Sequence, residues 1–260
     1  MKKLGLALGA GGSRGVAHIG FLKALEEEGI HPDFISGSSM GSVVGAAYAA
    51  GVSIARMKEA VMNLRVLDLI GLAGKRGGLF GTKKMRALLQ RYIGDLQFSD
   101  LRVPFRCVAV DMCSQQVVEF SEGSVLDAIV ASSSIPSVFH PQERDGMRLI
   151  DGGILERVPA ELVKKMGANI VVAVDVIGQK TCSEECPNMI GVLMETVDIM
   201  DNYRTKARRE ANKKIIDMWL EPDLGNMSIY DLKKIEFAYD KGYEMGKENV
   251  AAIKKLLGRK

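Results

Sequence analysis

The sequence lacks the features that mark several protein classes. No apolar run among its 260 residues approaches the ~18 residues of a membrane-spanning helix, so any membrane contact is expected to be peripheral. The early apolar run at residues 4–8 is too short for a signal peptide, which favours a cytoplasmic protein, with peripheral contact at the inner membrane face left open. No Pro/Ser-rich linker, internal repeat or low-complexity stretch divides the chain. We therefore expect one large domain over residues 1–260 rather than two small ones.

Cysteine, histidine and net charge are also sparse. The chain has four cysteines and three histidines, and these do not cluster. This favours free thiols over the alternative of a Cys182–Cys186 disulfide or metal site, and we predict neither a metal nor a cofactor. The net charge of +3 does not indicate nucleic acid binding. The basic residues between 206 and 214 are interleaved with acids, as on a solvated helix face.

Glycine, in contrast, is abundant in short loops between apolar runs. Residues 3–8 are predicted to form a buried strand, and residues 9–15, Gly-Ala-Gly-Gly-Ser-Arg-Gly, precede an amphipathic helix that stops at Gly29. Unpaired amides in such a loop form an anion site, which suits a dinucleotide or an oxyanion. A dinucleotide fingerprint needs an acid at the end of the second strand. Here Asp33 begins that strand, so an oxyanion hole is favoured.

A second glycine-flanked segment, Gly37-Ser38-Ser39-Met40-Gly41, lies between a short apolar strand and a helix of small residues. The Gly-x-Ser-x-Gly pattern is typical of a nucleophile elbow, in which the central serine stands on a sharp turn at the carboxyl end of a strand. The glycines let neighbouring backbone approach closely. The pentapeptide alone also fits an ordinary strand-to-helix turn, but the glycine loop favours Ser39 as a nucleophile.

A serine nucleophile needs a base, and the histidines are poorly placed to supply one. His18 lies in the first helix and His31 in a connecting turn, so only His140 follows Ser39 as an ordinary triad requires. Asp151 is the stronger candidate, because an apolar strand ends there and two glycines leave the carboxylate accessible. In isolation Asp-Gly-Gly is usually a turn. A triad esterase that uses His140 stays the alternative.

These motifs together resemble the patatin-like phospholipase family, in its bacterial single-domain branch. The glycine loop, the elbow and the Asp-Gly-Gly turn occur in the family's order, and the connecting stretches 108–111, 131–136 and 167–175 look alike too. The resemblance, with the alternating strand and helix patterns up to about residue 176, implies an α/β fold, a three-layer α/β/α sandwich with a mainly parallel central sheet. It also implies a Ser-Asp dyad without histidine: the nucleophile Ser39, the general base Asp151, an oxyanion loop of Gly11, Gly12 and Ser13, and the supporting residues Arg14, Gly15, Gly37, Gly41, Gly152 and Gly153.

Two positions depart from the family's pattern. Ala10 stands at the first glycine of the loop, and Glu156-Arg157 follow the Asp turn where an Asn-x-Pro pattern is usual, although Pro159 is retained. The predicted activity is hydrolysis of a lipid acyl ester, with the base strength of Asp151 raised by desolvation. The sequence leaves open which ester is cleaved. A catalytically weak, lipid-binding regulatory protein on the same fold is a further alternative.

Two more segments carry predictions. Residues 61–81 are apolar but contain five glycines, which disfavour a buried helix. They form either a helix end with a packed loop or a mobile cap over the acyl pocket, with Lys75 and Arg76 facing anionic head groups. Residues 177–260 are predicted to add a late strand at 218–222 and closing helices, two of them over 228–257, and a homo-oligomer contact there is left open.

Overall fold

An eight-stranded sheet forms the centre of the protein in the computed structural model, which describes residues 2–65, 68, 78–178 and 189–258. The strand order is β10-β9-β1-β2-β4-β8-β7, with β5 also paired to β4. The five strands from β10 to β4 run parallel, and β5, β7 and β8 are antiparallel to their neighbours. The bounds are β1 (Leu4–Leu8), β2 (Phe34–Ser38), β4 (Phe105–Asp111), β5 (Gln116–Phe120), β7 (Gln142–Arg144), β8 (Met147–Asp151), β9 (Ile170–Val174) and β10 (Met218–Leu220). A separate parallel pair is formed by β3 (Gly78–Phe80) and β6 (Ser137–Phe139).

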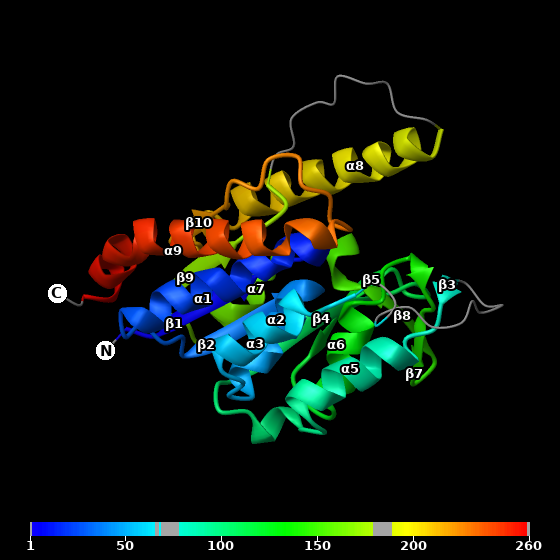
Figure 1. Cartoon of the computed structure of the whole chain (residues 1–260), viewed down its shortest axis with the longest axis horizontal. Helices are drawn as coiled ribbons and strands as arrows, with labels where there is room; N and C mark the ends of the chain where they lie inside the picture. Colours follow the sequence, from blue (N-terminus) through cyan, green and yellow to red (C-terminus); the bar gives the residue numbers. More distant parts are fainter. Residues whose placement is uncertain (1, 66–67, 69–77, 179–188, 259–260) are drawn as a thin grey trace.

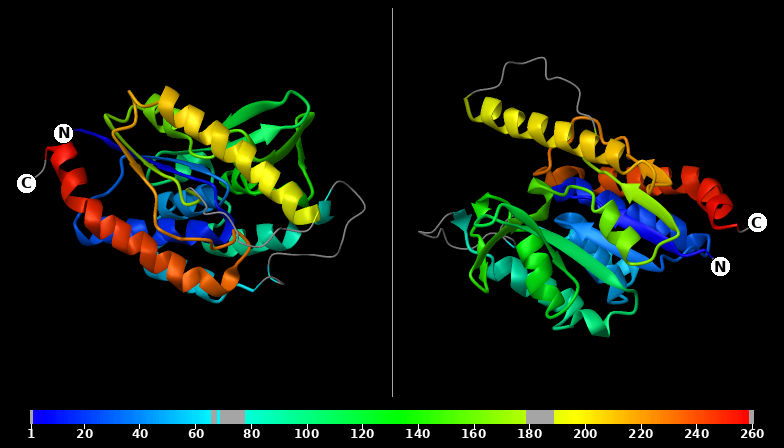
Figure 2. Two further views of the ribbon diagram at one scale, coloured as in Figure 1. Left: turned by 90° about the horizontal axis from the view of Figure 1, so that it is seen from above. Right: turned by 180° about the vertical axis from the view of Figure 1, so that it is seen from behind.

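Helices cover both faces of this sheet (Figures 1 and 2). Side chains alternate between faces along a strand. Leu4, Leu6 and Leu8 of β1 therefore enter the larger core, whereas Ala7 joins a smaller core beside α7. The helices on the larger core are α1 (Ala17–Glu27), α2 (Met40–Ala49), α3 (Ile54–Met62), α5 (Lys83–Ile93), α6 (Val125–Ser132) and α9 (Ile235–Leu257), and those on the other side are α7 (Ala160–Lys165) and α8 (Met189–Ala211). The predicted three-layer α/β/α arrangement is confirmed.

The closing segment differs from the prediction in its number of helices. The late strand is present as β10, which ends before Pro222, but the two closing helices predicted over 228–257 are wrong. A short 3-10 turn at Leu232–Lys234 leads into a single helix, α9. Its Gly242 does not interrupt it, because α9 packs there directly on α1: a Cβ on Gly242 would lie 1.9 Å from the carbonyl oxygen of Ala17.

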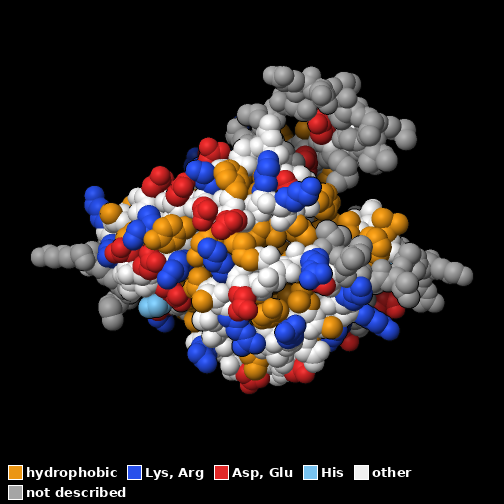
Figure 3. All heavy atoms as spheres, in the orientation of Figure 1, with side chains coloured by type: hydrophobic (Ala, Val, Ile, Leu, Met, Phe, Trp, Pro, Cys, Tyr) orange, Lys and Arg blue, Asp and Glu red, His pale blue; other side chains and the backbone are white. Residues whose placement is uncertain are grey.

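α8 is longer than its basic segment suggested and projects beyond the body of the protein (Figures 1 and 2). None of the described helices combines the length and the apolar content that crossing a bilayer requires. Lysine, arginine, aspartate and glutamate side chains are interspersed over the face shown in Figure 3, with hydrophobic side chains between them.

Candidate active site

Ser39 occupies a strained turn between the last residue of β2 and the first residue of α2. Its backbone angles are φ 49° and ψ −123°, a conformation that costs a residue with a side chain ~1–3 kcal/mol. Glycine is required at the two flanking positions because other backbone atoms approach them closely. A Cβ on Gly37 would lie 2.6 Å from the carbonyl oxygen of Gly41, and a Cβ on Gly41 would lie 2.1 Å from that of Leu8. The structure therefore has the predicted elbow at Ser39.

Asp151 lies at the end of β8 and faces this elbow. The hydroxyl of Ser39 donates a hydrogen bond of 2.5 Å to Oδ2 of Asp151, and the amide of Gly153 donates one of 2.8 Å to Oδ1. Gly152 packs against β4, since a Cβ there would lie 2.3 Å from the carbonyl oxygen of Val108. Ser39 and Asp151 are only 5% and 6% exposed. The two residues predicted from separate motifs thus meet in a nearly dry contact.

Burial changes the acidity of this carboxyl group. Desolvation raises the pKa of Asp151 to about 6, although the hydrogen bonds from Ser39 and Gly153 oppose the rise, and the charge of Asp201 adds to it slightly. A carboxyl group with this pKa is ionised at neutral pH and is a stronger base than an exposed aspartate.

The glycine loop lies beside Ser39, and Gly12 and Ser13 line the same cavity. The left-handed conformation falls on Gly12, with φ 52°, and Ala10 needs no such conformation, so the departure at Ala10 causes no strain there. The amide of Ser13 donates to the carbonyl oxygen of Ile229 at 2.8 Å. Ser13 is therefore a weaker candidate for the oxyanion hole than Gly11 and Gly12.

Arg14 is buried and holds loops together. Its guanidinium group donates to the carbonyl oxygens of Val176, Ile177, Gly225 and Met227 at 2.6 to 3.1 Å. Arg14, which was predicted as the basic position of the loop, therefore holds the chain after β9 and the segment before α9 in place. Gly15 lets the loop approach α2, because a Cβ on it would lie 2.4 Å from Cγ of Met40.

The histidines lie elsewhere. Nε2 of His18 is 2.8 Å from the carbonyl oxygen of Gly9, and complete burial lowers the pKa of His18 to about 4, so a neutral ring supports the glycine loop. His31 contacts the hydroxyl of Tyr48. His140 follows β6, and its amide binds the carbonyl oxygen of Phe80. Across the described residues, the hydroxyl of Ser39 has Asp151 and no histidine as its partner.

A large apolar cavity of about 530 Å³ opens beside Ser39. Three helices supply much of its lining, each with residues at the spacing of one helical face. These residues carry no motif, and the spacing along α5 is the sequence signal that could have found them. The lining residues that these three helices contribute are Met40, Val43, Val44 and Ala47 from α2, Met57, Ala60 and Val61 from α3, and Met85, Leu88, Leu89, Tyr92 and Ile93 from α5.

Two predictions fall largely or wholly outside the described residues. Most of the predicted cap, including Lys75 and Arg76, lies there, as do Cys182 and Cys186. The described ends of the cap segment reach the site, since Val61, Leu64 and Phe80 line the cavity. The cap stays a prediction. Cys107 and Cys113 are free cysteines. Within the described ranges, no group of His, Cys, Asp and Glu residues could hold a metal ion.

A model of the family described as "Patatin-like phospholipase" matches residues 6–164, which contain the glycine loop, the elbow and the Asp-Gly-Gly turn. The chain belongs to this family. An uncharacterised NTE family protein of Mycobacterium tuberculosis is 36% identical over 180 residues, which cover 68% of this chain and 50% of that protein. Human patatin-like phospholipase domain-containing protein 6 is 34% identical over 184 residues, or 68% of this chain and 13% of that protein. Lysophospholipase nte1 of Aspergillus fumigatus is 27% identical over 295 residues, or 97% of this chain and 18% of that protein.

The matches span half or less of these patatin-like relatives. Solved structures show the same fold at low identity. VipD from Legionella pneumophila has a TM-score of 0.66 at 14% identity and covers 96% of this chain and 67% of its own. Human GIVD cytosolic phospholipase A2 has a TM-score of 0.50 at 12% identity and covers 99% and 59%.

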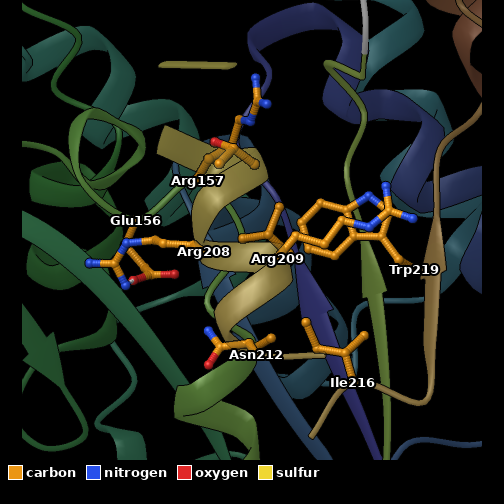
Figure 4. A pocket seen from close by; sticks show the side chains of 10 residues that line it. Glu156, Arg157, Arg208, Arg209, Asn212, Ile216 and Trp219 are labelled. Atoms are coloured by element: carbon orange, nitrogen blue, oxygen red, sulfur yellow. Dashed lines mark ion pairs between the residues drawn. The ribbon is translucent and has the colours of Figure 1, made fainter. Parts of the chain in front are cut away.

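Glu156 and Arg157, the second departure from the patatin-like pattern, attach α8 to the segment that follows the Asp-Gly-Gly turn (Figure 4). Arg157 is 4% exposed and contacts Asp175 at 3.3 Å, and it donates to Asp201 and Asn202 of α8 at 2.9 Å each. Glu156 forms an ion pair with Arg208 of α8. The unusual residue pair was visible in the sequence, but its partners on α8 are more than 40 residues away along the chain.

Proposed function

We propose that this protein is a lipid acyl-ester hydrolase in which Ser39 and Asp151 form the catalytic dyad. The observation that carries the proposal is the 2.5 Å hydrogen bond from Ser39 to Asp151 beside an apolar cavity of about 530 Å³. Family membership supports a lipid substrate, and several relatives are named as phospholipases or as a lysophospholipase.

The geometry suits a two-step acyl transfer. As Oγ of Ser39 attacks the acyl carbonyl carbon, its proton passes to Oδ2 of Asp151, and the carbonyl oxygen becomes an oxyanion. The amides of Gly11 and Gly12 and the N-terminus of α2 would stabilise that charge. Asp151 then returns the proton to the departing alkoxide, which leaves an acyl-serine ester. Asp151 next removes a proton from an attacking water, and as the second oxyanion collapses it passes that proton to the departing Oγ of Ser39, which releases the fatty acid and regenerates both residues.

The surroundings favour this chemistry for a fatty acyl chain. The cavity wall is almost entirely apolar, so a hydrocarbon chain gains stabilisation by leaving water there. An acyl chain in the cavity would also keep water from Asp151, and it would thereby maintain the raised pKa on which the base depends.

A fluorophosphonate probe tests the nucleophile directly. We expect it to label Ser39 in the full chain, and we expect the labelling and the hydrolysis of a p-nitrophenyl acyl ester to disappear together in Ser39→Ala. Ser38→Ala is the matched control, because this neighbouring serine is buried and its hydroxyl has no hydrogen-bond partner among the described residues. Labelling that persists in Ser39→Ala, or an intact protein that cleaves no acyl ester, would refute the proposal.

A further inference from the structure

α8 is inverted in its polarity. Its outward face, away from the sheet, carries Val192, Ile199, Met200 and Tyr203, spaced so that they share one side of a helix. The side chains of Ile199, Met200 and Tyr203 are 68%, 65% and 79% exposed. A surface helix normally turns its apolar side toward the core. Here the apolar side, which we call the α8 stripe, faces solvent.

The inward face of the same helix is polar and firmly attached. Asp201 and Asn202 accept hydrogen bonds from the buried Arg157, and Arg208 pairs with Glu156. Figure 4 shows Arg208 beside Glu156, with Arg209 turned to the other side over Trp219, where the guanidinium lies 5.0 Å from the ring centroid. Rolling the helix to bury its stripe would take Asp201 and Asn202 away from the buried Arg157, leaving Asp175 as its ionic partner, and would break the pair of Arg208 with Glu156. The inversion is therefore fixed by the fold.

The helix is also adjacent to the catalytic residues. Arg204 donates to the carbonyl oxygen of Gly153 at 3.3 Å, and Gly153 in turn binds Asp151. Asp198 acts electrostatically on Tyr230, whose side chain is 49% exposed and lines the cavity beside Ser39. The inward side of α8 therefore lies next to the Asp-Gly-Gly turn and close to Tyr230 in the wall of the apolar cavity.

The dimensions of the stripe favour a lipid surface over a second copy of the chain. From Val192 to Tyr203 the helix rises about 16 Å, and one helix is ~10 Å wide. Such a strip is far smaller than the ~800 Å² that each partner buries in a stable protein interface. A row of aliphatic side chains with a tyrosine, bordered by Glu195 and Lys206, is instead the pattern of a helix that lies in the plane of a membrane surface.

We propose that α8 is a membrane-docking helix whose stripe of Val192, Ile199, Met200 and Tyr203 enters the outer region of a lipid layer and holds the cavity of Ser39 against it. This inference rests on the proposed function, because it supplies the route by which a lipid ester reaches Ser39. The interaction is chiefly apolar, so it acts on neutral as well as on anionic lipid.

Vesicle binding tests the proposal without turnover. The full chain carrying Ser39→Ala is mixed with unilamellar phosphatidylcholine vesicles, and the bound fraction is measured by flotation. Adding Ile199→Ser, Met200→Ser and Tyr203→Ser is expected to lower the partition constant at least about tenfold. The matched control is Met112→Ser with Phe237→Ser, which removes exposed apolar side chains outside α8 and is expected to bind as the parent does.

A fluorescent probe reports insertion independently. Trp219 is the chain's single tryptophan. In a variant that carries both Trp219→Phe and Ile199→Trp, the tryptophan fluorescence comes from the α8 stripe alone. A blue shift on adding vesicles is expected, and an unchanged spectrum would overturn the proposal.

The remaining outcomes separate the alternatives. With Ser39 intact, the triple serine variant should hydrolyse a short soluble ester within about twofold of the parent while losing activity on vesicles. Equal loss on both substrates, or vesicle binding equal to that of the parent, would overturn the docking role. So would a lipid-free dimer in sedimentation that the triple variant converts to monomer, because the stripe would then contact a second copy. If neither protein cleaves the soluble ester, the proposed function fails, whereas the binding result still stands.

Discussion

Oδ2 of Asp151 lies 2.5 Å from the hydroxyl oxygen of Ser39, although 112 residues separate the two along the chain. The sheet brings them together through β4. Ser38 pairs with Val108, and Asp151 pairs with the next residue of that strand, Ala109. Because β5 pairs with residues 107–111 along the other edge of β4, β2 and β8 share one edge of β4 and meet end to end there, which brings the base to the nucleophile.

The first prediction concerns the identity of the base. Asp151→Asn should lower kcat for a soluble acyl ester by ~10²–10⁴-fold, the usual effect of removing a general base, whereas His140→Ala should keep most of its activity. Circular dichroism serves as the control that both variants fold. An active Asp151→Asn together with an inactive His140→Ala would instead support a histidine triad.

The pH dependence of catalysis follows from the raised pKa of Asp151. Only the ionised carboxylate can accept the proton of Ser39, and protonation occurs as the pH falls through about 6. We expect kcat/KM for a soluble ester to be level at neutral pH and to fall about tenfold per pH unit below about 6. The measurement is a pH–rate profile with an uncharged substrate. A profile that stays level to pH 4 would contradict the assignment.

The same pKa predicts a cost in stability. Because the folded-state pKa is raised from 3.8 to about 6, the folded protein binds this proton more tightly than the unfolded chain does, and stability falls as the pH rises from about 4 to about 6. Above that range the ionised carboxylate destabilises the fold by at most ~3 kcal/mol. Asp151→Asn should therefore raise Tm at pH 8 and leave it unchanged near pH 4. A lower Tm at pH 8 would show that the carboxylate stabilises the fold.

Ala47 is predicted to limit the length of the acyl chain. It is the small residue at the end of the α2 face that begins at Met40, about 10 Å along the helix from the elbow. Ala47→Phe should fill that part of the cavity and lower kcat/KM for long-chain p-nitrophenyl esters at least about tenfold, with little change for the acetate. Tyr48→Phe, at a neighbouring position that does not line the cavity, is the control. A uniform change across chain lengths would contradict this role.

Arg14→Lys tests whether the shape of the guanidinium matters beyond its charge. A lysine keeps the charge, but its single ammonium group cannot donate to all four carbonyl oxygens that the three nitrogens of the guanidinium group bind. We expect the free energy of unfolding to fall by about 2–4 kcal/mol, measured by urea denaturation, and kcat to fall as the glycine loop loosens. Lys2→Arg, at an exposed position, is the control. Unchanged stability would mean that other contacts hold these loops.

The strand-loop-helix units were predictable because each is encoded locally. Residues 4–8 form a buried strand, and the glycines of the loop and the elbow mark places where backbone conformation or close approach excludes a side chain. The closing segment was harder to predict. A glycine such as Gly242 is an interruption in a sequence pattern, whereas in the fold it is the point where α9 touches α1.

The sequence by itself determined the fold class, the elbow at Ser39 and the acid at the end of β8, because these depend on neighbouring residues and on periodicity. Only the tertiary structure decided three other features. It showed that Asp151 rather than a histidine contacts Ser39, that Arg14 binds carbonyl groups, and that α8 turns its polar side inward onto Arg157. Each of these joins residues far apart along the chain. The contacts, and the desolvation that sets the pKa of Asp151, exist only once the strands and helices have packed.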